Sequence, residues 1–270
     1  AGAPVPVAVV ERMRKLLPDG AMLWTPYGAT ECLPVAVVEG RELTEFARPR
    51  TEHGAGTLVG KVVAPNQVRI IRISDGAIPS WNDDLVLPPG EVGEITVIGP
   101  TATEHYFNRP DAERVGKIQD GERTVHRMGD LGYFDEHQRL WMCGRRSQRV
   151  ESASGPIYTE QVEPIFNTHP QVFRTALVGV GAHGQEEPVL IVELEPGVGR
   201  EEHERIREEL LVLATRHAHT RGISKVLYYP RFPVDIRHNA KIGREYLKRW
   251  ASEHLGIAIP AVAIGTEKQP

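Results

Sequence analysis

The sequence contains only two cysteines, Cys32 and Cys143, and they form neither a CxxC pair nor a metal-like spacing. A disulfide framework is therefore not expected, and we expect a reduced, cytoplasmic protein. Long apolar runs are also missing. The tail 256–265 is apolar, but it contains a proline and is shorter than the roughly 20 residues of a membrane-spanning helix. We expect no transmembrane segment.

The chain also lacks a strong excess of either charge. Its 270 residues include 32 Lys and Arg against 36 Asp and Glu, a net charge of −4, so we expect no nucleic-acid partner. A small basic cluster, Arg145, Arg146 and Arg149, is read as a solvated face unless a phosphate binds there. The start, residues 1–6, resembles neither an initiator methionine nor a signal peptide, and we interpret it as a cut inside a longer chain.

The first half of the chain consists of two stretches that differ in their pattern of apolar and turn-forming residues. Residues 5–17 have apolar positions at helical spacing, and the short apolar run 21–24 is interpreted as a buried strand leading into the turn-rich segment 25–31. This order suggests α/β layering. Residues 56–146 hold short strand candidates separated by turn formers such as 88–90, which predicts a small barrel or folded sheet.

The pattern of predicted elements changes again near Ser147. From there strand and helix candidates alternate, which predicts a compact α+β domain. The candidate helices are 159–168, 201–219 and 240–252, and the candidate strands are 175–180, 188–194 and 225–229. The predicted fold class is thus a multidomain α/β and α+β protein.

The segment Tyr27-Gly-Ala-Thr-Glu31 carries side chains suited to a nucleotide. Its aromatic ring could stack on a base, its glycine lets the backbone approach a phosphate, and its hydroxyl and carboxylate could bind phosphate oxygens and Mg²⁺. A β-turn with incidental polar residues is the alternative, and it is favoured where no context is known.

Two further segments could complete such a site. Asp130 lies between glycines, where a carboxylate can accept both ribose hydroxyls. Arg145 follows 15 residues later and offers donors to ribose or phosphate. A turn aspartate and a solvated arginine are the alternatives.

Lys241, near the end of the chain, lies on a predicted loop that enters a helix. A lysine there could reach a forming acyl phosphate and stabilise charge in the transition state. A surface lysine is the alternative. His238 is interpreted as a hydrogen-bonding loop residue rather than a base.

Taken in order, these segments resemble the adenylate-forming superfamily, which includes acyl-CoA synthetases, luciferases and peptide-synthetase adenylation domains. The matches are Tyr-Gly-x-Thr-Glu at 27–31, Gly-Glu-Val-Gly-Glu at 90–94, Gly-Asp-Leu-Gly at 129–132, Gly144-Arg145 and Lys241. The resemblance covers nearly the whole chain and implies the C-terminal half of such an enzyme. It implies that 1–55 end the sheet subdomain of a large domain, 56–146 form a β-barrel subdomain, and 147–270 form a mobile domain with the catalytic lysine.

The resemblance also implies roles for single residues around ATP and AMP. Tyr27 would stack on adenine, Gly28 would let the backbone approach the nucleotide, Thr30 would contact the α-phosphate and Glu31 would hold Mg²⁺. Asp130 and Arg145 would bind the ribose hydroxyls. Lys241 would contact the carboxylate and the bridging oxygen while pyrophosphate leaves, and Ser147 would be the inter-domain hinge.

Departures from the family pattern narrow the identity. Met128, Ser147 and Ala240 replace the usual residues at their positions, and Pro156-Ile157 stand where thioester-forming relatives usually have an arginine. This last departure argues against a CoA-dependent second step. Longer stretches resemble the olefin β-lactone synthetases of bacterial hydrocarbon biosynthesis: 25–34, 143–147, 158–164 and 232–241.

The expected activity is therefore ATP-dependent conversion of a long-chain β-hydroxy acid to a β-lactone, with release of AMP and pyrophosphate. Other enzymes of a hydrocarbon-biosynthesis assembly are possible partners. A fatty acyl-CoA synthetase acting on a fatty acid is the first alternative, and a non-catalytic nucleotide-binding or partner-docking domain is the second. The family's Gly/Ser/Thr-rich phosphate loop does not occur in these 270 residues, so we expect the isolated chain to be inactive.

Overall fold

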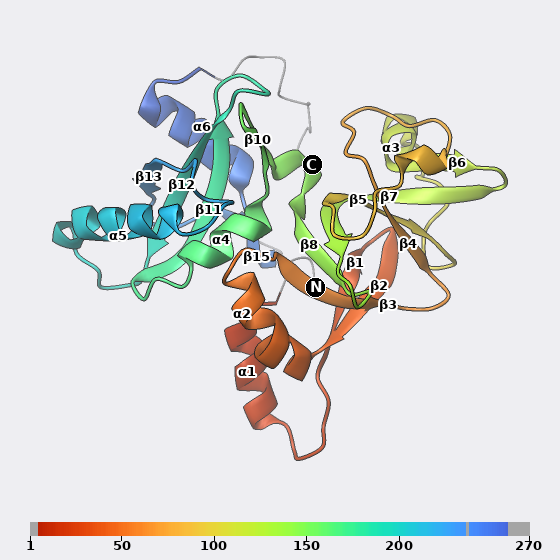
Figure 1. The fold of residues 1–270 in the computed structure, drawn as a ribbon, viewed down its shortest axis with the longest axis horizontal. Coiled ribbons are helices and arrows are strands. Elements are labelled where there is room, and N and C mark those ends of the chain that lie inside the picture. Colours follow the sequence, from red (N-terminus) through yellow and green to blue (C-terminus); the bar gives the residue numbers. More distant parts are fainter. Residues whose placement is uncertain (1–4, 236–237, 259–270) are drawn as a thin grey trace. The chain divides into compact units, whose positions relative to one another are not determined.

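The computed structural model describes residues 5–235 and 238–258 (Figure 1). Contacts within the chain divide it into two compact units, Ala1–Ser147 (unit 1) and Gln148–Pro270 (unit 2). Each unit is described by itself. Among the described helices, none is long and apolar enough to cross a lipid bilayer.

Unit 1 is built around one antiparallel sheet of eight strands. The strands are β1 (Trp24–Ala29), β2 (Cys32–Glu39), β3 (Thr57–Val62), β4 (Gln67–Ile71), β5 (Gly93–Ile98), β6 (Lys117–Asp120), β7 (Arg123–Phe134) and β8 (Leu140–Arg145). They follow the order β1-β2-β3-β8-β7-β5-β4, and β6 pairs with β7. The helices are α1 (Val7–Leu16), η1 (Glu42–Ala47), α2 (Arg48–Thr51), η2 (Asp83–Leu85), α3 (Pro110–Gly116) and η3 (Arg146–Gln148).

The strands of unit 1 are rich in β-branched residues, which suit a pleated, buried surface. One core cluster gathers Val35, Ile95, Val97 and Met128 from the strands β2, β5 and β7. The amphipathic helix α1, predicted at 5–17, buries Val10 in a second cluster with Trp141. Burial of these apolar faces is what holds the sheet in its folded form.

Among the described strands, no ladder joins β1 to β4, so the sheet is folded but not a closed barrel. Residues 24–39 belong to this same sheet, because Ala36 pairs with Val62 across β2 and β3. The predicted buried strand at 21–24 is wrong: β1 begins at Trp24, and the side chains of Met22 and Trp24 are 61% and 52% exposed. The segment expected to form turns therefore lies mostly on a strand.

Unit 2 is an α+β fold, as the spacing of its elements predicts. Its central sheet has the order β11-β12-β13, with an antiparallel and then a parallel pair. The elements are β9 (Val150–Ser152), β10 (Gly155–Ile157), α4 (Thr159–Phe166), β11 (Val172–Val180), β12 (Glu187–Leu194), η4 (Arg200–Glu202), α5 (His203–Thr215), β13 (Lys225–Tyr228), β14 (Val234–Asp235), β15 (His238–Ile242) and α6 (Arg244–Leu255).

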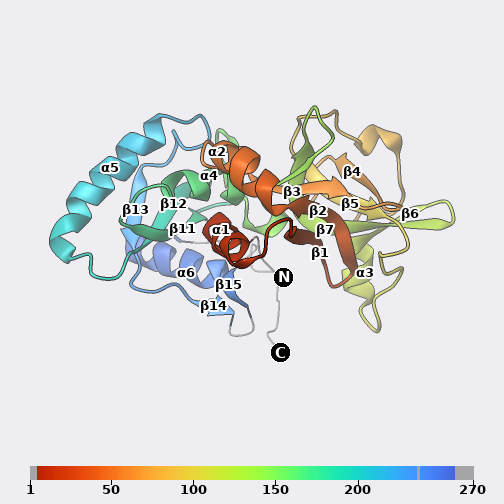
Figure 2. The same cartoon turned by 90° about the horizontal axis from the view of Figure 1, so that it is seen from below.

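Helices cover both faces of the central sheet of unit 2. Figure 2 shows α4 and α5 on one face and α6 on the other. Alternate residues of β11 serve the two faces: Leu177 packs with Phe166 and Leu210, whereas Val178 packs with Leu247. This period of two is the property of a strand that allows one sheet to bury two helical layers.

Candidate functional site

Three of the predicted nucleotide-binding residues meet on unit 1. The Tyr27 hydroxyl on β1 donates a hydrogen bond to Asp130 Oδ2 at 2.9 Å. Asp130 on β7 is the cross-strand partner of Arg145 on β8, and Arg145 Nε lies 3.5 Å from Asp130 Oδ1. The sheet thus gathers one phenol, one carboxylate and one guanidinium from strands that are distant in sequence.

Burial and charge fix the protonation of this group. Burial, followed by the negative charge of Asp130, raises the pKa of Tyr27 well above its usual value. The phenol therefore stays protonated and acts as a donor. The side chain of Asp130 is 6% exposed and that of Arg145 is 46% exposed. The arrangement presents an oriented carboxylate beside an accessible arginine, which is the donor and acceptor set that a vicinal diol such as ribose requires.

Gly28 has a structural reason for being glycine. The β1–β2 hairpin is irregular between Tyr27 and Ala29. A Cβ on Gly28 would lie 2.4 Å from the Cys32 carbonyl oxygen and 2.8 Å from Leu33 Cδ1. Tight closure of the hairpin therefore demands glycine here, and a role in approaching the nucleotide remains a prediction.

Glu31 follows the exposed Thr30 at the hairpin turn and is half-buried. Tyr106 hydrogen-bonds to the Glu31 carboxylate, and burial together with this negative charge raises the pKa of Tyr106 to about 12. The Thr103 N–H donates to the Glu31 carbonyl oxygen at 2.8 Å. Both the side chain and the backbone of Glu31 are thus held in place.

Two further titratable residues near Glu31 escaped the sequence reading. Lys117 and His126 are cross-strand partners on β6 and β7. The Lys117 ammonium donates to the Thr103 carbonyl oxygen, and burial lowers its pKa. Burial, followed by the charge of Lys117, lowers the pKa of His126 to about 4. No local motif marks these residues, because their proximity depends on the pairing of β6 with β7.

Lys241 lies on unit 2, where its side chain is exposed. The segment predicted as a loop forms β15, in which Ile242 pairs with Val234, and α6 begins at Arg244. Arg244 makes a two-pronged ion pair with Glu163, whose carboxylate also accepts the Leu177 N–H at 2.7 Å. The lysine-bearing strand is therefore tied to the core of unit 2. The side chain of His238 lies outside the described residues.

Ser147, the predicted hinge, is exposed and is the last residue of unit 1. The residue before it, Arg146, belongs to a buried ionic cluster with Glu94 and Arg127 that sequence reasoning also missed. Glu94 is the last residue of the Gly90–Glu94 motif. The motif therefore indicated one member of the cluster, but not its partners Arg127 and Arg146.

Comparison with known proteins finds a matching family and close relatives. A family described as AMP-binding enzyme matches residues 1–107. The olefin beta-lactone synthetase of Xanthomonas campestris pv. campestris is 61% identical over 94% of this chain and 46% of its own length. That of Stenotrophomonas maltophilia is 60% identical over 94% of this chain and 47% of its own length. The chain thus spans a little under half of these relatives.

A solved structure has the same fold. The amide bond synthetase McbA from Marinactinospora thermotolerans superposes with a TM-score of 0.70 at 25% identity, over 92% of this chain and 46% of the other. The similarity extends across both units.

Proposed function

This chain belongs to the AMP-binding, adenylate-forming enzymes, and from that membership we propose that it serves an ATP-dependent synthetase that converts a long-chain β-hydroxy acid into a β-lactone. The observation that carries the proposal is the group formed by Tyr27, Asp130 and Arg145. Its support is the 61% identity to an olefin beta-lactone synthetase. Other enzymes of a hydrocarbon-biosynthesis assembly in the cytoplasm would be its partners.

The nucleotide would bind at this group on unit 1. Asp130 would accept the two ribose hydroxyls, because its carboxylate is oriented by the Tyr27 hydroxyl and by Arg145. Arg145 would donate to the same ribose. The Tyr27 ring would lie against adenine, with Gly28 leaving room for the backbone to approach. Thr30, exposed at the hairpin turn, would contact the α-phosphate.

Magnesium would be held by Glu31. No group of three or more His, Cys, Asp or Glu residues suited to a metal occurs among the described residues. A lone, well-oriented carboxylate fits Mg²⁺, which usually takes one or two carboxylates and completes its shell with phosphate oxygens and water. When bound, the ion would neutralise charge on the phosphates of ATP.

The first step would be formation of an acyl-adenylate. A carboxylate oxygen of the acid attacks the α-phosphorus, and the bond to pyrophosphate breaks. Lys241 would place its positive charge beside the carboxylate and the bridging oxygen while this bond breaks. Ser147 would act as the hinge that brings unit 2, and with it Lys241, to the nucleotide.

The second step would need no added nucleophile. The β-hydroxyl of the substrate attacks its own activated carbonyl, loses its proton, and displaces AMP as the four-membered ring closes. Because this hydroxyl is already tethered to the carbonyl, the step gains the advantage of an intramolecular reaction. Pro156 and Ile157, in place of the arginine of thioester-forming relatives, agree with a reaction that uses no CoA.

The test supplies the whole protein with a 3-hydroxy fatty acid, ATP and Mg²⁺ without CoA. We expect AMP, pyrophosphate and a product lighter than the acid by one water, measured by mass spectrometry. Lys241→Ala should lower adenylation by about 10²- to 10³-fold, whereas Lys225→Ala, which removes a half-buried ion-pair partner of Glu187, should not. Product that forms only with CoA, as a thioester, would establish the acyl-CoA synthetase alternative. Unchanged adenylation in Lys241→Ala would refute the role of the lysine.

A further inference from the structure

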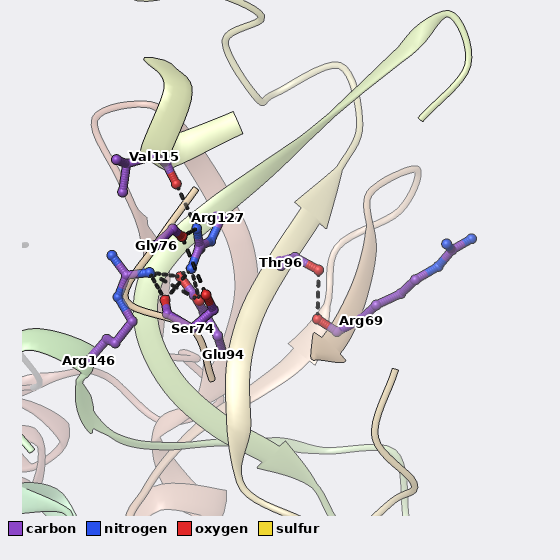
Figure 3. Close-up of polar contacts among 8 residues, drawn as sticks. All are labelled: Arg69, Ser74, Gly76, Glu94, Thr96, Val115, Arg127 and Arg146. Carbon is purple, nitrogen blue, oxygen red and sulfur yellow. Dashed lines mark hydrogen bonds and ion pairs between the residues drawn. The ribbon is translucent and has the colours of Figure 1, made fainter. Parts of the chain in front are cut away.

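A buried ionic cluster in unit 1 includes Arg146, which precedes Ser147, the last residue of that unit. Figure 3 shows the side chains of Arg127 and Arg146 both pointing to the carboxylate of Glu94. The Glu94 side chain is fully buried and that of Arg127 is 1% exposed. Arg127 Nη2 donates to Glu94 Oε2 at 2.6 Å, and Arg127 Nε donates to Oε1 at 3.2 Å. Arg127 therefore contacts both carboxylate oxygens of Glu94 and would balance its charge even without Arg146.

Arg127 also fixes the backbone around the cluster. Its guanidinium donates to the carbonyl oxygens of Ser74, Gly76 and Val115 at 2.5, 2.7 and 2.9 Å. These bonds join the loop after β4 and the end of α3 to β7. With all of these acceptors satisfied, the cluster is a rigid part of unit 1.

Arg146 attaches to this rigid part from the end of β8. Its Nη1 donates to the Ser74 carbonyl oxygen at 2.6 Å and lies 3.2 Å from Glu94 Oε1. Its side chain is 17% exposed. Arg145, its neighbour, reaches Asp130 instead. Successive residues thus serve the proposed ribose site and the buried cluster, and Arg146 is the last residue of unit 1 fastened to its interior.

The chain is fastened again soon after the boundary. Val150 is fully buried, and the N–H of Glu151 donates to Glu186 Oε2 at 2.8 Å. Glu186 is itself held by Lys248 at 2.6 Å. Between these two attachments lie Ser147, which is exposed, Gln148, which is half-buried, and Arg149. The Arg149 side chain is only 8% exposed and pairs with Glu151, so Arg149 already belongs to the second attachment.

We propose that Arg146, docked on Glu94, confines the rotation of unit 2 to a pivot at Ser147 and Gln148. Arg146 is a positioning residue: it limits the backbone dihedral angles that can change, and so limits the range of positions that Lys241 can reach. The proposal rests on the proposed function, because it assigns a purpose to rotation in the same enzyme. Loss of Arg146 leaves Glu94 paired with Arg127, so Arg146→Gln should fold.

The experiment uses the whole protein with spin labels on Glu122→Cys and Arg216→Cys, which are exposed positions on units 1 and 2. Cys32 and Cys143 are fully buried and should not be labelled. Pulsed electron–electron dipolar spectroscopy then measures the distance distribution between the units. Exchange of pyrophosphate into ATP, followed with unlabelled protein, measures adenylation. Arg139→Gln is the matched control, because Arg139 is a similarly shielded arginine, 11% exposed against 17% for Arg146, that pairs with Asp135 and takes no part in the Glu94 cluster.

For Arg146→Gln we expect a broader distance distribution than in the wild type. We also expect a fall in kcat for exchange of at least about tenfold, since small misplacements of a catalytic group are costly. The KM for ATP should change by less than about twofold, because the nucleotide group stays intact. Arg146→Lys keeps a cation for Glu94 and should restore part of the narrow distance distribution and part of kcat. Arg139→Gln should change neither the distance distribution nor kcat.

The proposal is overturned if Arg146→Gln gives a distribution as narrow as the wild type. It is also overturned if Arg139→Gln broadens the distribution equally, or if Arg146→Gln raises the KM for ATP with kcat unchanged, since Arg146 would then bind nucleotide. Absence of exchange in the wild type would refute the proposed function alone, because the distance distributions would still decide whether Arg146 confines the pivot.

Discussion

His126 is a buried base without a full set of partners. Its side chain is 2% exposed, one ring nitrogen hydrogen-bonds to the Gly116 carbonyl, and Nδ1 has no hydrogen-bond partner among the described residues. Burial first, and then the charge of Lys117, lowers its pKa from 6.5 to about 4. The folded protein therefore keeps a neutral imidazole in mildly acidic solution, where the unfolded chain would be protonated.

This difference predicts a pH dependence of stability. Between pH 6.5 and about 4, His126 is protonated in the unfolded chain but neutral in the folded chain. The free energy of unfolding therefore falls as the pH falls, by about 3 kcal/mol over this range. Stability from this source is complete above pH 6.5. His126→Gln retains a donor for Gly116. When its free energy of unfolding is measured with urea at several pH values between 7 and 4, it should fall less steeply with pH than that of the wild type. His137→Gln, at a residue with a largely exposed side chain, should keep the wild-type slope, and parallel curves for His126→Gln would contradict the assignment.

At the level of single elements, α6 depends on one buried ion pair at its first residue. The Arg244 and Glu163 side chains are 10% and 8% exposed. Removal of one partner leaves the other charge buried without a counter-charge. Arg244→Met should therefore lower the free energy of unfolding by about 3–5 kcal/mol. Because β15 precedes Arg244 directly, the same change should loosen the strand that carries Lys241.

A double variant separates the charge from the shape. Glu163→Gln combined with Arg244→Met removes both charges and keeps an acceptor for the Leu177 N–H, so most of the lost stability should return. Arg205→Met is the control, because Arg205 pairs with Glu202 and Glu209 on an exposed surface and should leave the urea midpoint nearly unchanged. A double variant as unstable as Arg244→Met would show that packing of the arginine, rather than its charge, supports α6.

The sequence predicts elements better than it predicts their pairing. The helix at 159–168 and the strands at 175–180 and 188–194 correspond to α4, β11 and β12, because hydrophobic period is a local property. The pairing of Lys117 with His126 and of Glu94 with Arg127 depends on which strands become neighbours, which no local pattern records. The apolar run 21–24 does not form the expected buried strand. Met22 and Trp24 are exposed, and the strand β1 begins only at Trp24.

The candidate site shows the same division. Tyr27, Asp130 and Arg145 were each recognisable only through their motifs, and their contact required the folded sheet. The motif predicts Gly28 as a nucleotide-binding residue, yet the close approach of the Cys32 carbonyl already demands a glycine there. A motif can therefore combine a residue that chemistry selects with one that backbone geometry selects.

At the scale of the whole molecule, the two units have separate interiors. The clusters around Ile95, Trp141 and Ile71 contain only residues of unit 1, and those around Phe166 and Leu247 contain only residues of unit 2. Units with separate cores can unfold in separate steps. We therefore expect two transitions when this chain is heated in a calorimeter.

AMP should raise the temperature of only one of these two transitions, because Tyr27, Asp130 and Arg145 all lie on unit 1. A ligand at 100 times its Kd stabilises the unit that binds it by about 2.7 kcal/mol. Arg244→Met identifies the other transition, since it should lower the unfolding temperature of unit 2 alone. Asp130→Asn weakens the acceptor for ribose and should abolish the shift with AMP. If AMP instead raised the transition that Arg244→Met lowers, the nucleotide would bind to unit 2, and the assignment of the site to β1, β7 and β8 would fail.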